Sequence, residues 1–134
     1  MKVCVIDDSP LVRERLHELL AEIPGISLVE QMDQTSGTVK AIQAAEPDVV
    51  ILDIQLPHGS GIEILEELKS IELPMVKIML TAFPNPLYRQ RCLEAGAHYF
   101  LDKSVEFECI VEVLDSLVAE QNANANPLDL KINS

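Results

Sequence analysis

The chain has 134 residues, of which 48% are hydrophobic and 24% charged, and its formal net charge is −12. This length corresponds to one domain that can bury a core of its own, and the composition is ordinary for a globular protein. The acidic balance excludes the basic surface that binding to nucleic acid or to an anionic membrane would require. Three widely spaced cysteines give neither a disulfide framework nor a zinc pattern. Because we find no signal peptide and no membrane span, we expect a cytoplasmic protein.

Short runs rich in β-branched residues alternate with helical patterns along the chain. The expected strands are residues 2–6, 27–32, 48–52, 76–80 and 99–101. The first expected helix begins at Ser9-Pro10, which are typical of an N-cap and a first helical position. Four further helices are expected at about 35–46, 60–70, 85–95 and 105–120. Residues 121–134 are rich in Asn and have no period, so we expect a disordered tail after one domain of residues 1–120.

Five strand–helix units predict an α/β fold, with an open parallel sheet that is covered by helices on both faces. Ligands of such sheets bind at the carboxyl ends of the strands. Acidic residues follow two of the expected strands, and a threonine and a lysine follow two others. These residues are Asp7, Asp8, Asp53, Thr81 and Lys103. The fold would therefore bring five polar side chains to one edge of the sheet.

Three carboxylates at one edge repel each other unless a cation joins them, and Mg²⁺ prefers oxygen ligands that it shares with phosphate. A lysine suits a single anionic group, and a threonine hydroxyl donates to a phosphoryl oxygen. The set is suited to forming an aspartyl phosphate, with Asp53 as the nucleophile and Asp7 and Asp8 as metal ligands. On these residues alone a simpler interpretation stays open, in which Asp8 caps a helix and Lys103 forms a surface ion pair.

The sequence around Asp53 favours the first interpretation. Over about residues 2–120 the chain resembles the receiver domains of two-component response regulators. The features that carry the resemblance are the pair Asp7-Asp8, Asp53 followed by Pro57 and Gly61, the pair Thr81-Ala82, and Phe100 with Lys103.

The resemblance implies a doubly wound (βα)5 fold, with a five-stranded parallel sheet in the flavodoxin-like strand order 2-1-3-4-5. It implies that Asp53 accepts a phosphoryl group from a histidine kinase or a phosphotransfer protein. It further implies that Mg²⁺ is bound by Asp8 and Asp53, with Asp7 assisting through water. The backbone carbonyl of Gln55 would be a further ligand.

The resemblance also implies a switch. Thr81 would move to contact the phosphoryl group, Phe100 would swing inward behind it, and Lys103 would pair with a phosphoryl oxygen. The chain departs from the family pattern at Ser104, where many receivers have a proline after the lysine. A cis bond without proline costs about 3 kcal/mol, so the backbone of this loop is expected to differ from the usual form.

In the family, the residues two positions beyond the phosphoacceptor and two beyond the threonine affect the attack of water on the aspartyl phosphate. Here they are Gln55 and Phe83. Gln55 would orient or crowd a water molecule, and the bulky Phe83 would shield the phosphoryl group. We therefore expect slow self-dephosphorylation, although Phe83 could equally be a residue that packs on the fourth helix.

The expected fifth helix has more apolar residues than a core face needs. Its core face would be formed by Phe107, Ile110, Val111, Leu114, Leu117 and Val118. Val105, Cys109 and Val113 recur every four residues on roughly the opposite side, so we expect them to contact a partner protein or a second copy of the chain. The alternative is that these are scattered apolar surface residues, which need no explanation.

The preferred function is a stand-alone signalling switch that acts by protein–protein contact and is not an enzyme beyond its own phosphorylation and dephosphorylation. The alternative is the receiver part of a longer DNA-binding regulator, because the segments PGISLVEQ and AGAHYFLDKS are similar to those of regulators with a helix-turn-helix output. A phosphatase of the haloacid dehalogenase type would need a second aspartate where Gln55 stands. The chain also lacks the Gly-rich loop of dinucleotide-binding proteins.

Overall fold

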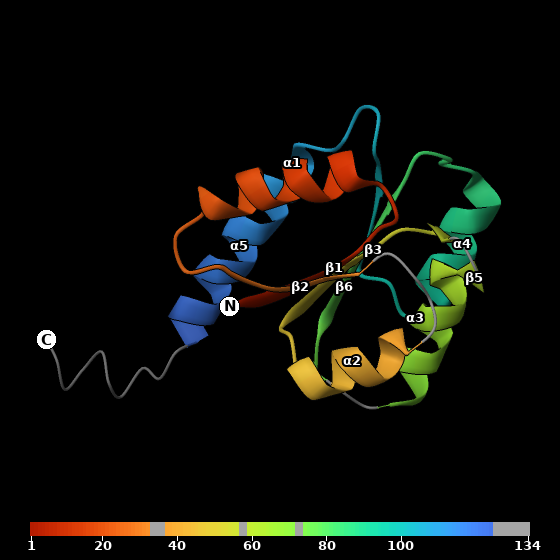
Figure 1. Cartoon of the computed structure of the whole chain (residues 1–134), viewed down its shortest axis with the longest axis horizontal. Helices are drawn as coiled ribbons and strands as arrows, with labels where there is room; N and C mark the ends of the chain where they lie inside the picture. Colours follow the sequence, from red (N-terminus) through yellow and green to blue (C-terminus); the bar gives the residue numbers. More distant parts are fainter. Residues whose placement is uncertain (33–36, 57–58, 72–73, 125–134) are drawn as a thin grey trace, which may run out of the picture.

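The computed structural model describes residues 1–32, 37–56, 59–71 and 74–124 (Figure 1). The strands of the main sheet are β1 (Lys2–Ile6), β2 (Ser27–Met32), β3 (Val49–Leu52), β6 (Val76–Thr81) and β7 (Tyr99–Asp102). The helices are α1 (Pro10–Ala21), α2 (Thr38–Ala45), α3 (Gly61–Ser70), α4 (Pro86–Glu94) and α5 (Cys109–Asn124). Two short strands, β4 (Gln55–Leu56) and β5 (Gly59–Ser60), pair antiparallel between β3 and α3.

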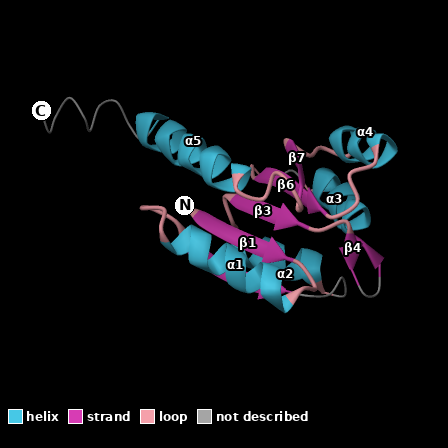
Figure 2. Cartoon of the chain, turned by 90° about the horizontal axis from the view of Figure 1, so that it is seen from above, coloured by secondary structure: helices cyan, strands magenta, loops and turns pink. Residues whose placement is uncertain are grey.

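The main sheet is parallel, and its strands lie in the order β2-β1-β3-β6-β7. This is the predicted order 2-1-3-4-5, so the prediction of a doubly wound α/β fold is confirmed. Figure 2 shows the arrows of β1 and β3 side by side and pointing the same way. Because the strands run in one direction, all their carboxyl ends lie at one edge of the sheet.

Helices cover both faces of the sheet, which explains why the central strand β3 is apolar throughout. All four residues of β3 are buried. Figure 1 shows α1 and α5 on one face and α2 and α3 on the other. On the first face Leu16 of α1 and Ile110 of α5 belong to one core cluster, and on the second Ile42 of α2 and Leu65 of α3 belong to another. The two clusters fix the sheet between the helices and leave its edge for the site.

The fifth helix differs from its prediction at both ends. It begins at Cys109 and not near residue 105, and it continues to Asn124. The helix therefore extends four residues beyond its predicted end at residue 120, and the rest of the predicted tail lies outside the described residues. No helix in the described part of the chain has the length and apolarity to cross a membrane.

The predicted apolar line of Val105, Cys109 and Val113 is also wrong in its geometry. Val105 is 78% exposed but precedes the helix, in the turn after β7. Cys109 and Val113 are partly buried and pack against the core cluster that lies between α1, α5 and the sheet. The three residues therefore do not form one solvent-exposed face of a helix.

Candidate functional site

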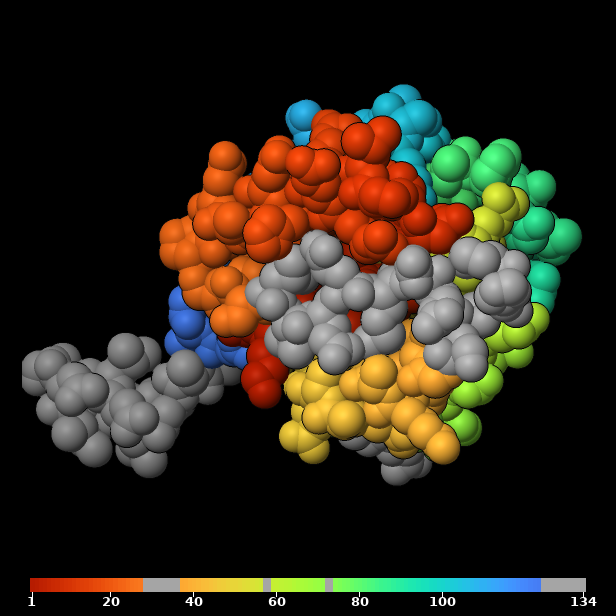
Figure 3. Space-filling model, in the orientation of Figure 1, coloured from red at the N-terminus to blue at the C-terminus, as the bar shows by residue number. Residues whose placement is uncertain are grey.

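The carboxyl edge of the sheet brings together segments that are far apart in the sequence. The backbone N–H of Asp53 donates to the carbonyl of Ile6 (2.9 Å), which ties the end of β3 to the end of β1. The N–H of Lys103 donates to the carbonyl of Thr81 (2.8 Å), which ties the end of β7 to β6. In the space-filling view, residues around the start of α1, around α4 and after β7 adjoin one another at this edge (Figure 3). The strand ends thus deliver the predicted residues to one place.

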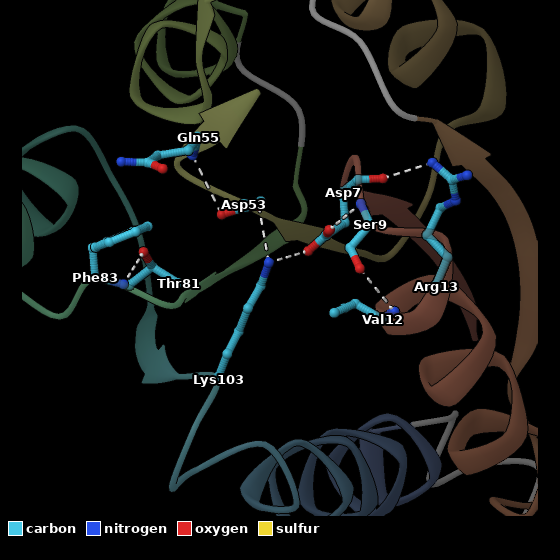
Figure 4. Close-up of polar contacts among 9 residues, drawn as sticks. All are labelled: Asp7, Ser9, Val12, Arg13, Asp53, Gln55, Thr81, Phe83 and Lys103. Carbon is cyan, nitrogen blue, oxygen red and sulfur yellow. Dashed lines mark hydrogen bonds and ion pairs between the residues drawn. The ribbon is translucent and has the colours of Figure 1, made fainter. Parts of the chain in front are cut away.

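Lys103 links two of the three acids. Its Nζ atom lies 2.7 Å from Oδ2 of Asp7 and 2.9 Å from Oδ2 of Asp53 (Figure 4). Asp7 is 2% exposed and Asp53 is 5% exposed, so both pairs are shielded from water. The second oxygen of Asp7 accepts a hydrogen bond from the backbone N–H of Ser9 (2.9 Å). Asp7 is therefore held from two sides, whereas its neighbour Asp8 is exposed.

The electrostatics of the site are unfavourable for negative charge on Asp53. Burial raises the pKa of Asp53 above its ordinary value of 3.8, and the charge of Asp7 adds to this, although the hydrogen bond from Lys103 opposes it. For Lys103 burial acts to lower the pKa, but the hydrogen bonds to Asp7 and Asp53 outweigh it and the pKa is raised. Three carboxylates thus surround one ammonium group in this part of the described structure, so the formal charge of the cluster is negative.

The three acids can hold a metal ion. Asp7, Asp8 and Asp53 each offer a carboxylate oxygen, and these atoms lie within 4.8 Å of one another. A cavity of about 200 Å³ opens beside them, and it is lined by Asp8, Asp53, Gln55, Ala82, Phe83 and Lys103. A set of oxygen ligands with excess negative charge and adjacent space fits a hard cation such as Mg²⁺, with room for a phosphoryl group.

The two predicted switch residues are both buried. Thr81 is fully buried, and its Oγ1 atom accepts a hydrogen bond from the N–H of Phe83 (3.0 Å). Phe83 is 55% exposed and lines the cavity. Phe100 is buried in the core, and the guanidinium of Arg89 lies 5.9 Å from the centre of its ring. Thr81 is thus fixed by the loop that leads to α4, and Phe100 lies on the neighbouring strand.

The segment after Asp53 turns sharply. The N–H of Gln55 donates to Oδ1 of Asp53 (3.3 Å), and the side chain of Gln55 is exposed. A Cβ atom on Gly61 would lie 1.8 Å from the carbonyl oxygen of Asp53. This close approach explains why glycine stands at residue 61. Pro57, which the resemblance included, lies outside the described residues.

The loop after Lys103 is organised without a proline. The backbone N–H and the hydroxyl of Ser104 both donate to Oδ1 of Asp102, at 2.8 and 2.6 Å. These hydrogen bonds lower the pKa of Asp102. Among the residues that the structure describes, no peptide bond is cis. Ser104 thus organises this loop as a turn through its two hydrogen bonds to Asp102.

Arg13 is a residue that the sequence analysis did not single out. Its Nη1 atom donates to the backbone carbonyl of Asp7 (2.8 Å), from the first turns of α1 back to the end of β1 (Figure 4). The one signal in the sequence is an arginine six residues after the first acid, and spacing of this kind does not reveal a contact to a backbone atom.

The fold and this edge are those of response regulator receivers. The sequence model of the response regulator receiver domain matches residues 3–115, and the chain therefore belongs to this family of two-component signalling proteins. The signal receiver domain of the response regulator NarL from Mycobacterium tuberculosis superimposes with a TM-score of 0.78 at 30% identity. That match covers 84% of this chain and 91% of the other.

Two curated relatives support the same family assignment. The sensory transduction protein LytR of Staphylococcus haemolyticus is 31% identical over 96% of this chain and 49% of its own length. BvgA of Bordetella pertussis, a positive transcription regulator of virulence factors, is 30% identical over 88% of this chain and 56% of its own length. The chain thus spans about half the length of these relatives.

Proposed function

We propose that the chain is a phosphorylation-dependent signalling switch whose phosphoacceptor is Asp53. A carboxylate oxygen of Asp53 would attack the phosphorus of a phosphohistidine on a histidine kinase or phosphotransfer protein. The new P–O bond forms as the P–N bond breaks. The histidine leaves as a neutral imidazole, which keeps the proton on its other ring nitrogen. The observation that carries the proposal is the position of Asp53, which is nearly buried, next to a cavity and 2.9 Å from the ammonium of Lys103.

Asp8 and Asp53 would hold Mg²⁺, with Asp7 behind them and the backbone carbonyl of Gln55 as the further ligand that the family implies. The ion would neutralise charge on the acids and on the transferring phosphoryl oxygens. Lys103, already at hydrogen-bonding distance from Asp53, would pair with a phosphoryl oxygen once Asp53 is modified. Its charge then helps to stabilise the product as well as the reactant.

Signalling would follow from contact with other proteins and not from catalysis on another substrate. Thr81 would exchange its bond to Phe83 for one to the phosphoryl group, with Phe100 as the second switch residue. The output would be a downstream protein or a second copy of the chain, bound through α4 and α5. We place this activity in the cytoplasm, where the phosphorylated histidines of two-component kinases form.

A second candidate is that the chain is the receiver part of a longer DNA-binding regulator. The chain spans about half of its curated relatives, and BvgA is named a transcription regulator. The size of the protein in its native cells, measured with an antibody against the folded receiver, separates the two. A protein of about the mass of this chain supports the stand-alone switch, and one of about twice that mass supports the regulator.

The first experiment is the intact mass of the protein after incubation with Mg²⁺ and acetyl phosphate. We expect a gain of one phosphate that requires Mg²⁺ and is absent in Asp53→Asn. Asp102→Asn is the matched control, because Asp102 lies at the same edge but does not line the cavity. A wild-type protein that is folded and gains no phosphate, or an Asp53→Asn variant that gains it equally, would refute the proposal.

A further inference from the structure

The turn that carries Asp7 and Asp8 is fixed by several hydrogen bonds. Asp7 accepts hydrogen bonds on both carboxylate oxygens, from Ser9 and Lys103. Ser9 caps α1 by accepting from the N–H of Val12 (3.3 Å). Arg13, itself bound through its backbone N–H to the carbonyl of Ser9 (3.0 Å), reaches back to the carbonyl of Asp7 (2.8 Å). The contact is partly buried, and a charged donor makes such a bond stronger than a neutral one.

The position of Asp8 depends on these fixed points. The carbonyl that Arg13 holds belongs to the peptide unit that joins Asp7 to Asp8. The cap at Ser9 fixes the other side of Asp8. The carboxylate of Asp8 is exposed, yet one of its oxygens lies within 4.8 Å of oxygens of Asp7 and Asp53. With the backbone held on both sides, the carboxylate of Asp8 can leave this place only by rotation about its own side-chain bonds.

We propose that Arg13 is a positioning residue for the metal site, which holds the peptide between Asp7 and Asp8 so that the carboxylate of Asp8 faces the site. This inference rests on the proposed function, because it assumes that the three acids bind Mg²⁺. Groups that orient metal ligands are worth roughly tenfold or more in metal affinity when they are removed.

The charge of Arg13 acts in the opposite direction to its geometry. A cation near the acids repels Mg²⁺, so a role in charge balance alone predicts that a neutral residue at position 13 would tighten Mg²⁺ binding. A positioning role predicts that the same change weakens binding. A merely structural role predicts a lower melting temperature with unchanged Mg²⁺ affinity. The sign of the change in affinity therefore distinguishes the three.

The test is the dissociation constant for Mg²⁺, measured by isothermal titration calorimetry on wild type, Arg13→Met, Arg13→Lys and Arg15→Met. Arg15 is the matched control, because it lies on the same helix and contacts Phe107 and Glu108 instead of the acidic turn. We expect Arg13→Met to raise the dissociation constant by roughly tenfold. We expect Arg13→Lys, which keeps a charged donor, to lie between Arg13→Met and wild type, and Arg15→Met to equal wild type or bind slightly more tightly.

Circular dichroism of each variant identifies any that does not fold. If Arg13→Met does not fold, the dissociation constant of Arg13→Lys is compared with that of wild type instead. A dissociation constant for Arg13→Met that equals or falls below that of wild type overturns the inference and leaves the proposed function intact. An equal weakening in Arg15→Met overturns it as well. A folded wild type that binds no Mg²⁺ overturns both the inference and the metal-dependent function.

Discussion

Replacing the proposed phosphoacceptor by its neutral isostere should stabilise the protein in the absence of Mg²⁺. Asp53 is 5% exposed and shares its surroundings with Asp7 and Asp8. Lys103 is the cation that contacts it. In Asp53→Asn the amide oxygen can still accept from Lys103, at the cost of the long hydrogen bond from the N–H of Gln55 (3.3 Å), whereas the repulsion from the two acids disappears.

The magnitude follows from the distances. The carboxylate oxygens lie within 4.8 Å of one another, and two unit charges at that limit repel by about 3.5 kcal/mol at an effective dielectric constant of about 20. Asp53 has two such neighbours, and the ammonium at 2.9 Å attracts it by about 6 kcal/mol on the same scale. Water screens the repulsion from the exposed Asp8, so the repulsions and the attraction nearly cancel, and the cost of burying the charge decides the sign. We expect Asp53→Asn to gain about 1–2 kcal/mol, or a melting temperature higher by about 4–7 °C.

The assay is urea unfolding in EDTA, followed by circular dichroism because the chain has no Trp. Mg²⁺ should stabilise wild type more than Asp53→Asn and so reduce the difference. Asp115→Asn changes the net charge equally at an exposed position on α5 and should leave stability within about 0.5 kcal/mol. An Asp53→Asn protein that is less stable than wild type in EDTA would refute the electrostatic reasoning.

The pH dependence of this gain has a definite sign. Because the pKa of Asp53 is raised above 3.8 in the folded state, the folded protein binds this proton more tightly than the unfolded chain does. Wild type therefore gains stability from this group as the pH falls through the raised pKa, and the gain is complete below 3.8. The advantage of Asp53→Asn should be largest at pH 7 and shrink toward pH 4. A difference that stays constant or grows on acidification contradicts the sign.

Two further substitutions test the neighbours of Asp53. Phe83→Ala should shorten the lifetime of the phosphorylated protein several-fold, as measured by loss of the phosphate mass, because Phe83 lines the cavity; Leu87→Ala, at a side chain that is 62% exposed and outside that cavity, is the control. An unchanged lifetime in Phe83→Ala would remove the idea that it shields the phosphoryl group. Gly61→Ala should cost more than about 3 kcal/mol, because its Cβ would overlap the carbonyl of Asp53. Gly37→Ala, where φ is +74° but space is open, should cost about 1 kcal/mol, and equal costs in thermal unfolding would contradict the steric argument.

The parts of the fold that sequence predicts best are those set by burial. Val49–Leu52 are four apolar residues followed by an acid, and this pattern is that of a central strand that ends at a site. The strand order came from the family resemblance and not from periodicity. Which acids Lys103 contacts could not be predicted, because Asp7 and Asp8 are neighbours with the same chemistry. In the structure one is 2% exposed and paired, and the other is exposed.

The start of α5 shows where periodicity misleads. Apolar residues at Val105, Cys109 and Val113 have helical spacing, but local hydrogen bonds compete with the helix. Ser104 donates twice to Asp102, and the N–H of Asp102 donates to the carboxylate of Glu106 (3.1 Å). These bonds hold a turn, so the helix starts only at Cys109. The β4–β5 pair was not predicted for a different reason. Each strand has only two residues, which is too short to show an alternating pattern.

The hydrogen bond between Thr81 and Phe83 indicates how a change at the phosphorylation site would be transmitted to α4. Thr81 lies on β6, and in the present arrangement its hydroxyl accepts from the loop that leads into α4. If Thr81 turns to donate to a phosphoryl oxygen, the N–H of Phe83 loses this partner, at a cost of about 1 kcal/mol. The loop can then change its conformation, and α4 is the next element of the chain.

Because Arg89 of α4 lies over the ring of Phe100, a shift of α4 also alters the surroundings of the second switch residue. The face that changes on phosphorylation should therefore include α4 and its neighbour β7.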